Sequence, residues 1–183
     1  MFKKPILRLL LAAVLLPACG IGGALAASTS ANISVTATVS QGCSISTTSA
    51  LAFGAYDPVG ANATAALNAT GQVSVACSKG ATGLTIAMND GTHVVGTQRN
   101  MQGAAAAEIL QYNLFQPPSN VAGTPCTFPG TIPWNSTAPA GVLTLTSAPS
   151  KVARLYNVCG TIPGGQDATT GSYTDTVIAT LNF

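Results

Sequence analysis

The feature that most constrains the fold of this chain is a two-residue alternation of apolar and polar side chains, repeated in short runs. In residues 31–40, Asn, Ser and Thr separate a set of apolar side chains: Ala31, Ile33, Val35, Ala37 and Val39. Successive side chains of a strand point to opposite faces, so this alternation predicts a half-buried β-strand. We expect nothing before it in the mature chain to pair with it. The segment must therefore find a sheet edge in its own domain or in another molecule.

Residues 1–26 have the pattern of a secretion signal. Three basic residues (Lys3, Lys4 and Arg8) precede an apolar stretch at 9–16, and the small residues Ala24 and Ala26 follow. This order predicts removal of residues 1–26 by cleavage between Ala26 and Ala27. The apolar stretch is too short for a membrane anchor. The short basic signal is of a bacterial kind and indicates export to the periplasm or beyond.

A lipoprotein signal ending at Cys19 is the competing interpretation of this region. Pro17, which lies just before the small residue Ala18, disfavours it. With the secretion signal removed, residues 27–183 have a length typical of a single domain.

Few side chains of the chain are charged. The signal holds three of the seven Lys and Arg residues, which leaves four against five Asp and Glu and a net charge of about −1. No basic patch remains to neutralise phosphates, so nucleic acid is not an expected partner. Charged residues make up 7% of the chain, against roughly 25% in ordinary soluble domains. Either an uncharged extracellular domain or a subunit that packs against its own copies fits this composition.

Four cysteines follow the predicted cleavage site: Cys43, Cys77, Cys126 and Cys159. An even number in an exported chain predicts disulfides, and four cysteines allow three pairings. We favour Cys43–Cys77 and Cys126–Cys159, because each would join the ends of neighbouring predicted strands. No Cys-x-x-Cys occurs, so neither a redox motif nor a zinc knuckle is indicated.

Further β-like runs lie between turn signals, as expected of an all-β sandwich of seven or eight strands. They cover residues 44–46 leading to 51–54, 71–77, 84–88, 110–114, 142–145, 155–158 and 173–183. Residues 117–141 are rich in Pro, Gly, Ser and Thr and predict a long loop pinned by Cys126. The one helix candidate is 103–109, where four alanines follow Gly103. In the last run one face carries Val177, Ala179, Leu181 and Phe183.

Several blocks, in order along the chain, give it a family resemblance. They are Phe53-Gly54-Ala55-Tyr56-Asp57-Pro58, residues 71–77, Asn89-Asp90-Gly91, Arg99-Asn100-Met101, residues 110–114, Gly164-Gly165-Gln166 and residues 171–177. The series resembles the spore coat protein U domain family, whose members include subunits of Csu-type archaic chaperone–usher pili. The resemblance extends from about residue 40 to Phe183.

This resemblance implies an incomplete immunoglobulin-like sandwich (residues 41–183) that lacks its final strand. A periplasmic chaperone would first lend a strand to the open groove. At the outer-membrane usher the N-terminal strand of the next subunit would replace it, which is a form of β-strand addition. Residues 27–40 would be the donor extension, with Ala31, Ile33, Val35, Ala37 and Val39 as its buried face. The acceptor groove would be bordered by the C-terminal strand carrying Val177, Ala179, Leu181 and Phe183.

The implied function is that of a structural pilus subunit at the cell surface, which supports attachment and biofilm formation. Its partners would be neighbouring pilins, the chaperone and the usher, and no cofactor is implied. A tip adhesin would carry a binding domain in front of its pilin domain. The tail found there instead favours a shaft or linking subunit.

Enzyme activity is not expected from the motifs present. No G-x-S-x-G, H-E-x-x-H or Walker sequence occurs, and His93 is the only histidine, in a presumed surface loop. Four Asp residues (Asp57, Asp90, Asp167 and Asp175) lie beside turn residues, where capping is the usual role and a calcium site the rarer alternative. The competing function is a self-contained secreted β-sandwich that binds carbohydrate or a surface ligand, with its N-terminal strand in its own sheet.

Overall fold

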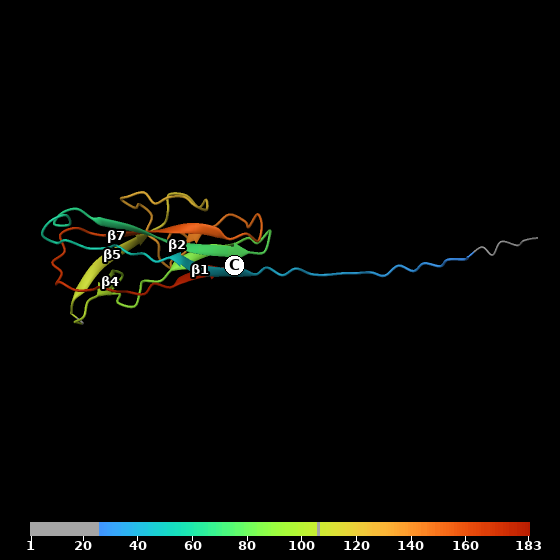
Figure 1. Cartoon of the computed structure of the whole chain (residues 1–183), viewed down its shortest axis with the longest axis horizontal. Coiled ribbons are helices and arrows are strands. Elements are labelled where there is room, and N and C mark those ends of the chain that lie inside the picture. The colour runs from blue at the N-terminus through green and yellow to red at the C-terminus, as the bar shows by residue number, and fades with distance from the viewer. Residues whose placement is uncertain (1–25, 106) are drawn as a thin grey trace, which may run out of the picture. The chain divides into compact units, whose positions relative to one another are not determined.

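The computed structural model of the chain describes residues 26–105 and 107–183. The chain divides into two units between Ala37 and Thr38. Residues 26–42 belong to no strand or helix, and Figure 1 draws this segment as an extended trace. The described residues form eight strands and no helix, with these bounds: β1 Cys43–Ser49, β2 Leu67–Cys77, β3 Thr85–Met88, β4 Arg99–Gln102, β5 Ile109–Phe115, β6 Leu143–Thr144, β7 Arg154–Ile162 and β8 Ala179–Asn182.

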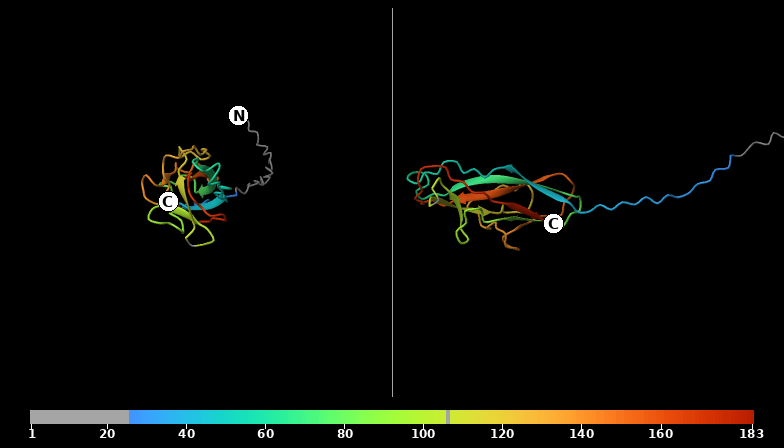
Figure 2. Two further views of the ribbon diagram at one scale, coloured as in Figure 1. Left: turned by 90° about the vertical axis from the view of Figure 1, so that its left-hand side faces the viewer. Right: turned by 90° about the horizontal axis from the view of Figure 1, so that it is seen from below.

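The strands form two antiparallel sheets. One sheet has the order β1-β2-β7-β5-β4 and the other has the order β6-β3-β8. Their inner faces meet in one core, whose most deeply buried side chains include Val75, Leu84, Ile86, Trp134 and Tyr156. Figure 2 shows the two layers from two further directions. The all-β sandwich expected from the alternation is therefore confirmed.

Three local expectations from the sequence were wrong. Residues 103–109 form no helix among their described positions, because they turn the hairpin between β4 and β5 and the Gly103 N–H donates to the Glu108 carbonyl at 2.8 Å. Residues 51–54 follow β1 without joining a ladder. The last run is a strand only over β8, while Thr174 alone forms a bridge, to Gln102.

The structure joins Cys43 to Cys77 and Cys126 to Cys159. The first disulfide ties the start of β1 to the end of β2, where these two residues are direct partners in the ladder. The second ties the long loop between β5 and β6 to the middle of β7. Each bond thus fixes an element that has few ladder partners of its own.

The predicted signal peptide lies outside the described residues, apart from Ala26. Ala26 and Ala27 themselves are exposed, and cleavage between them remains a prediction. No helix long and apolar enough to cross a membrane occurs within residues 26–105 and 107–183.

Candidate functional site: an open groove between two sheet edges

Two edge strands of the sandwich each lack a ladder partner on one side. β1 is one edge of the larger sheet, opposite β4, and pairs only with β2; β8 is one edge of the smaller sheet, opposite β6, and pairs only with β3. An unpaired edge presents free N–H and C=O groups to any strand that lies beside it. These two edges, at β1 and β8, are therefore each open to a further strand.

The C-terminal segment alternates in burial although most of it lies outside a ladder. The side chains at 173, 175, 177, 179 and 181 are partly buried, and those between them are exposed. Val177, Ala179 and Leu181 pack against the core, whereas Phe183 is 57% exposed. The predicted acceptor face is thus turned toward the core from Val177 to Leu181. The side chain of Phe183 does not pack against the core.

A groove of about 340 Å³ opens between β1 and this segment. Thr47 and Ser49 of β1 lie on one side, and Val177 and Ala179 lie on the other. Its floor consists of core side chains from both sheets: Val73, Met88, Tyr112, Leu114 and Val158. A second cavity, of about 560 Å³, follows between residues 51–58 and 168–173 and shares Leu51, Phe53, Met101 and Tyr173 with the first. The apolar core is therefore accessible where a further strand would cover it.

Leu51 and Phe53 continue the line of β1 over the floor of the groove. Leu51 lies close against Gly71 of β2, and both side chains lie against Gly160 of β7, where a larger residue would collide with them. A Cβ atom on Gly160 would lie 2.6 Å from Leu51 Cδ2 and 2.8 Å from Phe53 Cζ. The ring of Phe53 also meets Tyr112 edge-on, with ring centres 6.3 Å apart. The two glycines leave the space that these apolar side chains occupy.

Asp175 fixes the opposite wall of the groove. Its carboxylate is only 3% exposed and accepts hydrogen bonds from the Thr92 N–H at 2.9 Å, the Thr92 hydroxyl at 2.6 Å and the Tyr112 hydroxyl at 2.6 Å. Nδ1 of His93 lies 3.0 Å from the same carboxylate. Gly91 has a φ of +84°, and a Cβ there would overlap the carboxylate. Asp175 therefore ties the C-terminal segment to the 89–93 turn and to β5.

These contacts determine the charge states at the wall. Burial would raise the pKa of Asp175, but hydrogen bonds from Thr92 and Tyr112 outweigh it and lower that pKa below its usual value. Burial and the hydrogen bond to Asp175 raise the pKa of Tyr112 far above its usual value. At neutral pH the pair is thus a carboxylate that accepts and a phenol that donates.

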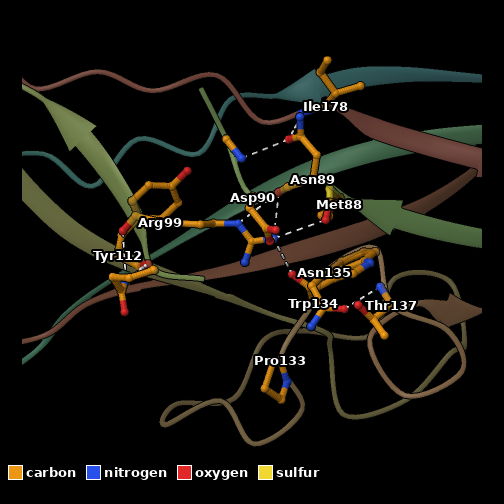
Figure 3. Close-up of polar contacts among 12 residues, drawn as sticks. Met88, Asn89, Asp90, Arg99, Tyr112, Pro133, Trp134, Asn135, Thr137 and Ile178 are labelled. Atoms are coloured by element: carbon orange, nitrogen blue, oxygen red, sulfur yellow. Dashed lines mark hydrogen bonds and ion pairs between the residues drawn. The ribbon is translucent and has the colours of Figure 1, made fainter. Parts of the chain in front are cut away.

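Arg99 of β4 binds the backbone next to this wall, at Met88, Asn89 and Trp134 (Figure 3). Its guanidinium donates to the carbonyls of Met88, Asn89 and Trp134 at 3.2, 2.8 and 2.8 Å. Asp90 lies 3.4 Å away, and burial lowers the pKa of Arg99 while the charge of Asp90 opposes that shift. The buried cation therefore joins the end of β3 to the Trp134 loop.

Asn89 connects this arrangement to the C-terminal segment. Its side-chain oxygen accepts from the Ile178 N–H at 2.8 Å, and its own N–H donates to the Ile178 carbonyl at 3.0 Å. Asn89 and Asp175 thus hold the two ends of the 89–93 turn against residues 173–178. The groove wall is therefore tied to this turn at Asp175 and at Ile178.

The predicted donor face is fully exposed in residues 31–39. Ile33, Val35 and Val39 are 86%, 88% and 87% exposed, and Ala31 and Ala37 are exposed as well. The chain then meets the sandwich at residues 40–42. There the Gln41 side chain donates to the Thr82 carbonyl at 3.1 Å, and the Ser78 hydroxyl accepts from the Gly42 N–H at 3.1 Å. The three-residue segment 40–42, which we call the root, is therefore anchored beside Ser78 and Thr82.

Sequence reasoning missed the polar network behind the groove. It assigned Asp175 to turn capping and His93 to a surface loop, whereas Asp175 is buried and His93, at 33% side-chain exposure, contacts it. Asp57 does cap a turn, because its carboxylate accepts from the N–H groups of Val59 and Gly60. Within the described part of the chain no group of three or more His, Cys, Asp or Glu residues could hold a metal ion.

The fold and groove define this chain as an antiparallel β-sandwich whose core is open between β1 and the C-terminal segment. The sequence profile of the Spore Coat Protein U domain matches residues 29–180, so the chain belongs to that family. The match begins at residue 29, earlier than the resemblance near residue 40 indicated, and it includes the alternating N-terminal segment. Protein U of Myxococcus xanthus is 32% identical over 169 residues, which cover 86% of this chain and 87% of that protein.

Solved structures are also similar to this chain, and one of them is the CsuC–CsuE chaperone–tip adhesion subunit pre-assembly complex from archaic chaperone–usher Csu pili of Acinetobacter baumannii. The match has 20% sequence identity and a TM-score of 0.48, and covers 80% of this chain and 41% of the matched chain. This chain thus spans about two fifths of that one.

Proposed function

We propose that this protein is a structural subunit of a surface pilus that assembles by donor-strand exchange. Residues 31–39 of one copy would lie in the groove between β1 and the C-terminal segment of the next. The observation that carries the proposal is the pairing of two incomplete features in one chain: a groove that exposes the core between two free strand edges, and a segment whose alternate apolar side chains are all exposed.

The two features agree in period and in length. The donor face has an apolar side chain at every second position of 31–39, and the acceptor segment turns every second side chain of 173–181 inward. Nine residues of extended chain span roughly 30 Å, at about 3.3 Å per residue, in both cases. Main-chain hydrogen bonds to both edges would give affinity, and the apolar side chains would set the register.

The expected gain in free energy is large for such a short segment. Burial of one Val or Ile side chain contributes about 1.5–3 kcal/mol, so Ile33, Val35 and Val39 together contribute several kcal/mol. In the free subunit this gain is missing and the core beneath the groove stays accessible. An isolated subunit is therefore expected to be marginally stable and prone to aggregate.

The groove is not equally wide along its length. Cα atoms of β1 and β8 approach within 8 Å of each other. A strand between two partners needs about 9.6 Å, twice the usual spacing of roughly 4.8 Å. The cavity itself lies toward Leu51 and Tyr173. We expect insertion to begin at that wide end and then to separate β1 from β8.

The same proposal places the mature protein outside the cytoplasm. The predicted signal would export it to the periplasm, where a chaperone would cover the groove, and an outer-membrane usher would deliver it to the surface. Attachment and biofilm formation are the roles that a polymer at that surface would support. The disulfides Cys43–Cys77 and Cys126–Cys159 are of the kind that forms in an oxidising compartment.

A donor variant with a matched control tests the proposal. Val35→Asp or Ile33→Asp places a charge on the face that would be buried, so polymers should be lost while the groove of each subunit stays intact. Thr36→Asp adds the same charge to the opposite face and should polymerise nearly as well as the unmodified chain. Size-exclusion chromatography and electron microscopy would measure polymer length. Normal fibres from Val35→Asp would contradict the proposal, as would a stable, non-polymerising native monomer that binds a glycan.

A further inference from the structure

The charged side chains of the sandwich are separated by sign between its two ends. The described residues contain four Lys or Arg and five Asp or Glu. Asp90 and Arg99 pair with each other, and Asp175 is buried in the groove wall. All remaining basic side chains, which are Lys79, Lys151 and Arg154, lie at one end, and all remaining acidic ones, which are Asp57, Glu108 and Asp167, lie at the other.

The basic end is defined by hydrogen bonds between its loops. The turn after β2, which carries Lys79, bonds to Ala148 just before Lys151 through the Gly80 N–H at 2.8 Å. Arg154 donates to the Thr146 carbonyl at 3.0 Å. The root of the N-terminal segment is anchored at this same end, because Gln41 bonds to Thr82. In Figure 1 the green turn at 78–83 and the orange turn at 146–153 lie together.

The acidic end is equally well defined. Asp57 begins a turn whose Asn62 carbonyl accepts from the Gly165 N–H at 2.9 Å. Asp167 follows Gln166, which bonds to Tyr56 and to Gln111. Glu108 accepts from the Thr169 hydroxyl at 2.9 Å. β2 leads from this end to the other over 11 residues, or roughly 33 Å at about 3 Å per residue.

We propose that the basic end of one copy docks on the acidic end of the next copy in the polymer. This inference rests on the proposed function and adds a second contact to it, outside the groove. Residues 27–40 carry no charged side chain, so apart from the α-amino group at the predicted new N-terminus they contribute no long-range attraction of their own. Opposite charges at the two ends supply that attraction and orient the approach.

The position of the root connects the charges to the groove. When the donor segment of one copy lies in the groove of another, the root (residues 40–42) leaves that groove. The root leads directly to the basic end of the donor's own sandwich. β8 ends beside Thr85, near the basic end, and residues 173–175 lie near Gln102, toward the acidic end. A donor that runs antiparallel to β8 leaves the groove at the acidic end of the acceptor copy. The basic end of the donor copy then meets the acidic end of the acceptor copy. A donor parallel to β8 brings two basic ends together.

Charge reversal in the full chain tests the docking surface. One variant, Lys79→Glu with Lys151→Glu, reverses the basic end, and another, Glu108→Lys with Asp167→Lys, reverses the acidic end. Each should slow polymer growth by about tenfold at low salt, since steering raises association rates by ten-fold or more. The combined variant with all four changes restores unlike charges and should polymerise within about threefold of the unmodified rate. In 1 M salt, where the screening length is about 3 Å, the differences should vanish.

Three controls make every outcome decisive. Thr127→Glu with Thr131→Glu adds negative charge in the exposed long loop, beside Cys126 and Gly130 and away from both ends, and should leave growth unchanged. Asp167→Lys alone repeats the test without disturbing the Glu108–Thr169 contact, in case the double variant does not fold. A peptide of residues 27–42 should bind each end-reversed variant equally well when Val35→Asp blocks self-assembly. If the peptide fails to bind at all, donor-strand exchange itself is wrong. If it binds but all variants polymerise at the unmodified rate, only the docking of the ends is wrong.

Discussion

At the scale of single residues, the groove wall depends on Asp175. Its carboxylate is buried, yet its pKa lies below the usual value because Thr92 and Tyr112 donate hydrogen bonds to it. A group with a depressed folded-state pKa stabilises the fold above its unfolded pKa and loses that contribution as the pH falls through the folded pKa. The contribution of Asp175 is therefore complete at pH 5–8 and is lost below about pH 4.

Asp175→Asn should lower the free energy of unfolding by about 1–3 kcal/mol at pH 7, because it removes a charged acceptor and leaves buried donors less well paired. The loss should shrink as the pH falls below about 4, because the unfolded carboxyl is protonated there, and it should be smallest below the lowered folded-state pKa of Asp175. Urea unfolding across pH, with the groove saturated by the 27–42 peptide, measures this. Asp167→Asn is the control, since Asp167 is exposed. Equal effects of the two variants would contradict the assigned role.

Gly160 is the second residue on which the groove depends. Gly160→Ala should destabilise the subunit by about 1–3 kcal/mol, because its Cβ would lie 2.6 Å from Leu51 Cδ2. Leu51→Ala removes that atom, so the double variant should lose less than the sum of the two single losses. A double-mutant cycle by urea unfolding measures the coupling. Strictly additive losses would show that the two side chains do not compete for this space.

At the scale of elements, the sequence predicted the strands whose alternation is clear. Residues 71–77, 84–88, 110–114 and 155–158 all lie in or overlap β2, β3, β5 and β7. β4 was missed because Arg99 and Asn100 are polar in sequence, although the structure buries both of them. The helix expected over 103–109 failed because a hairpin closes there. Local propensity does not reveal such tertiary constraints.

The sequence predicted which side chains of the C-terminal segment face inward, but not the hydrogen bonds that hold the groove wall in place. Alternation alone located the inward face at Val177, Ala179 and Leu181. The bonds of Asp175 to Thr92 and Tyr112 cross more than sixty positions of the chain, and no local pattern encodes such a distance. The sequence predicted the turn Asn89-Asp90-Gly91. It did not predict that the turn binds the C-terminal segment, because Ile178 and Asp175 come close to it only in the folded chain.

The two disulfides should differ in their effect on the groove, because they hold different elements of the fold. Cys43–Cys77 holds β1, which has one ladder partner and forms a flank of the groove, whereas Cys126–Cys159 holds a loop outside it. Their sequence separations are 34 and 33 residues, so the loop-entropy contributions are nearly equal, at roughly 4 kcal/mol each.

Replacement of either pair by Ser should therefore lower the yield of folded subunit to a similar degree. Removal of Cys43 and Cys77 should also weaken binding of the 27–42 peptide, because it releases the β1 edge. Removal of Cys126 and Cys159 should leave the affinity of the surviving folded fraction nearly unchanged. Isothermal titration calorimetry in the Val35→Asp background distinguishes the two. Unequal yields with equal affinities would contradict the assignment of β1 as a flank.

At the scale of the whole molecule, the sandwich is one strand short of covering its core. Three observations agree with this. The edges at β1 and β8 are free, a cavity lies between β1 and the C-terminal segment, and the apolar face of residues 31–39 is exposed. Under the proposed strand exchange, such a chain would gain stability from its neighbour, so that folding and assembly would be linked. Under the proposed docking of unlike ends, the sparse charges there would determine which way the neighbour approaches.

This linkage predicts a quantitative dependence of stability on the donor. In the Val35→Asp chain, which keeps its groove but lacks a working donor face, the free energy of unfolding should rise with the concentration of added 27–42 peptide. Above the dissociation constant, the rise is about 1.4 kcal/mol for each tenfold increase, as expected for a ligand that binds only the folded state. Thermal or urea unfolding at several peptide concentrations measures it. A peptide that itself carries Val35→Asp should have little effect, because its charge cannot enter the apolar floor formed by Val73, Leu114 and Val158. A stability that does not change with either peptide would mean that the core beneath the groove needs no partner.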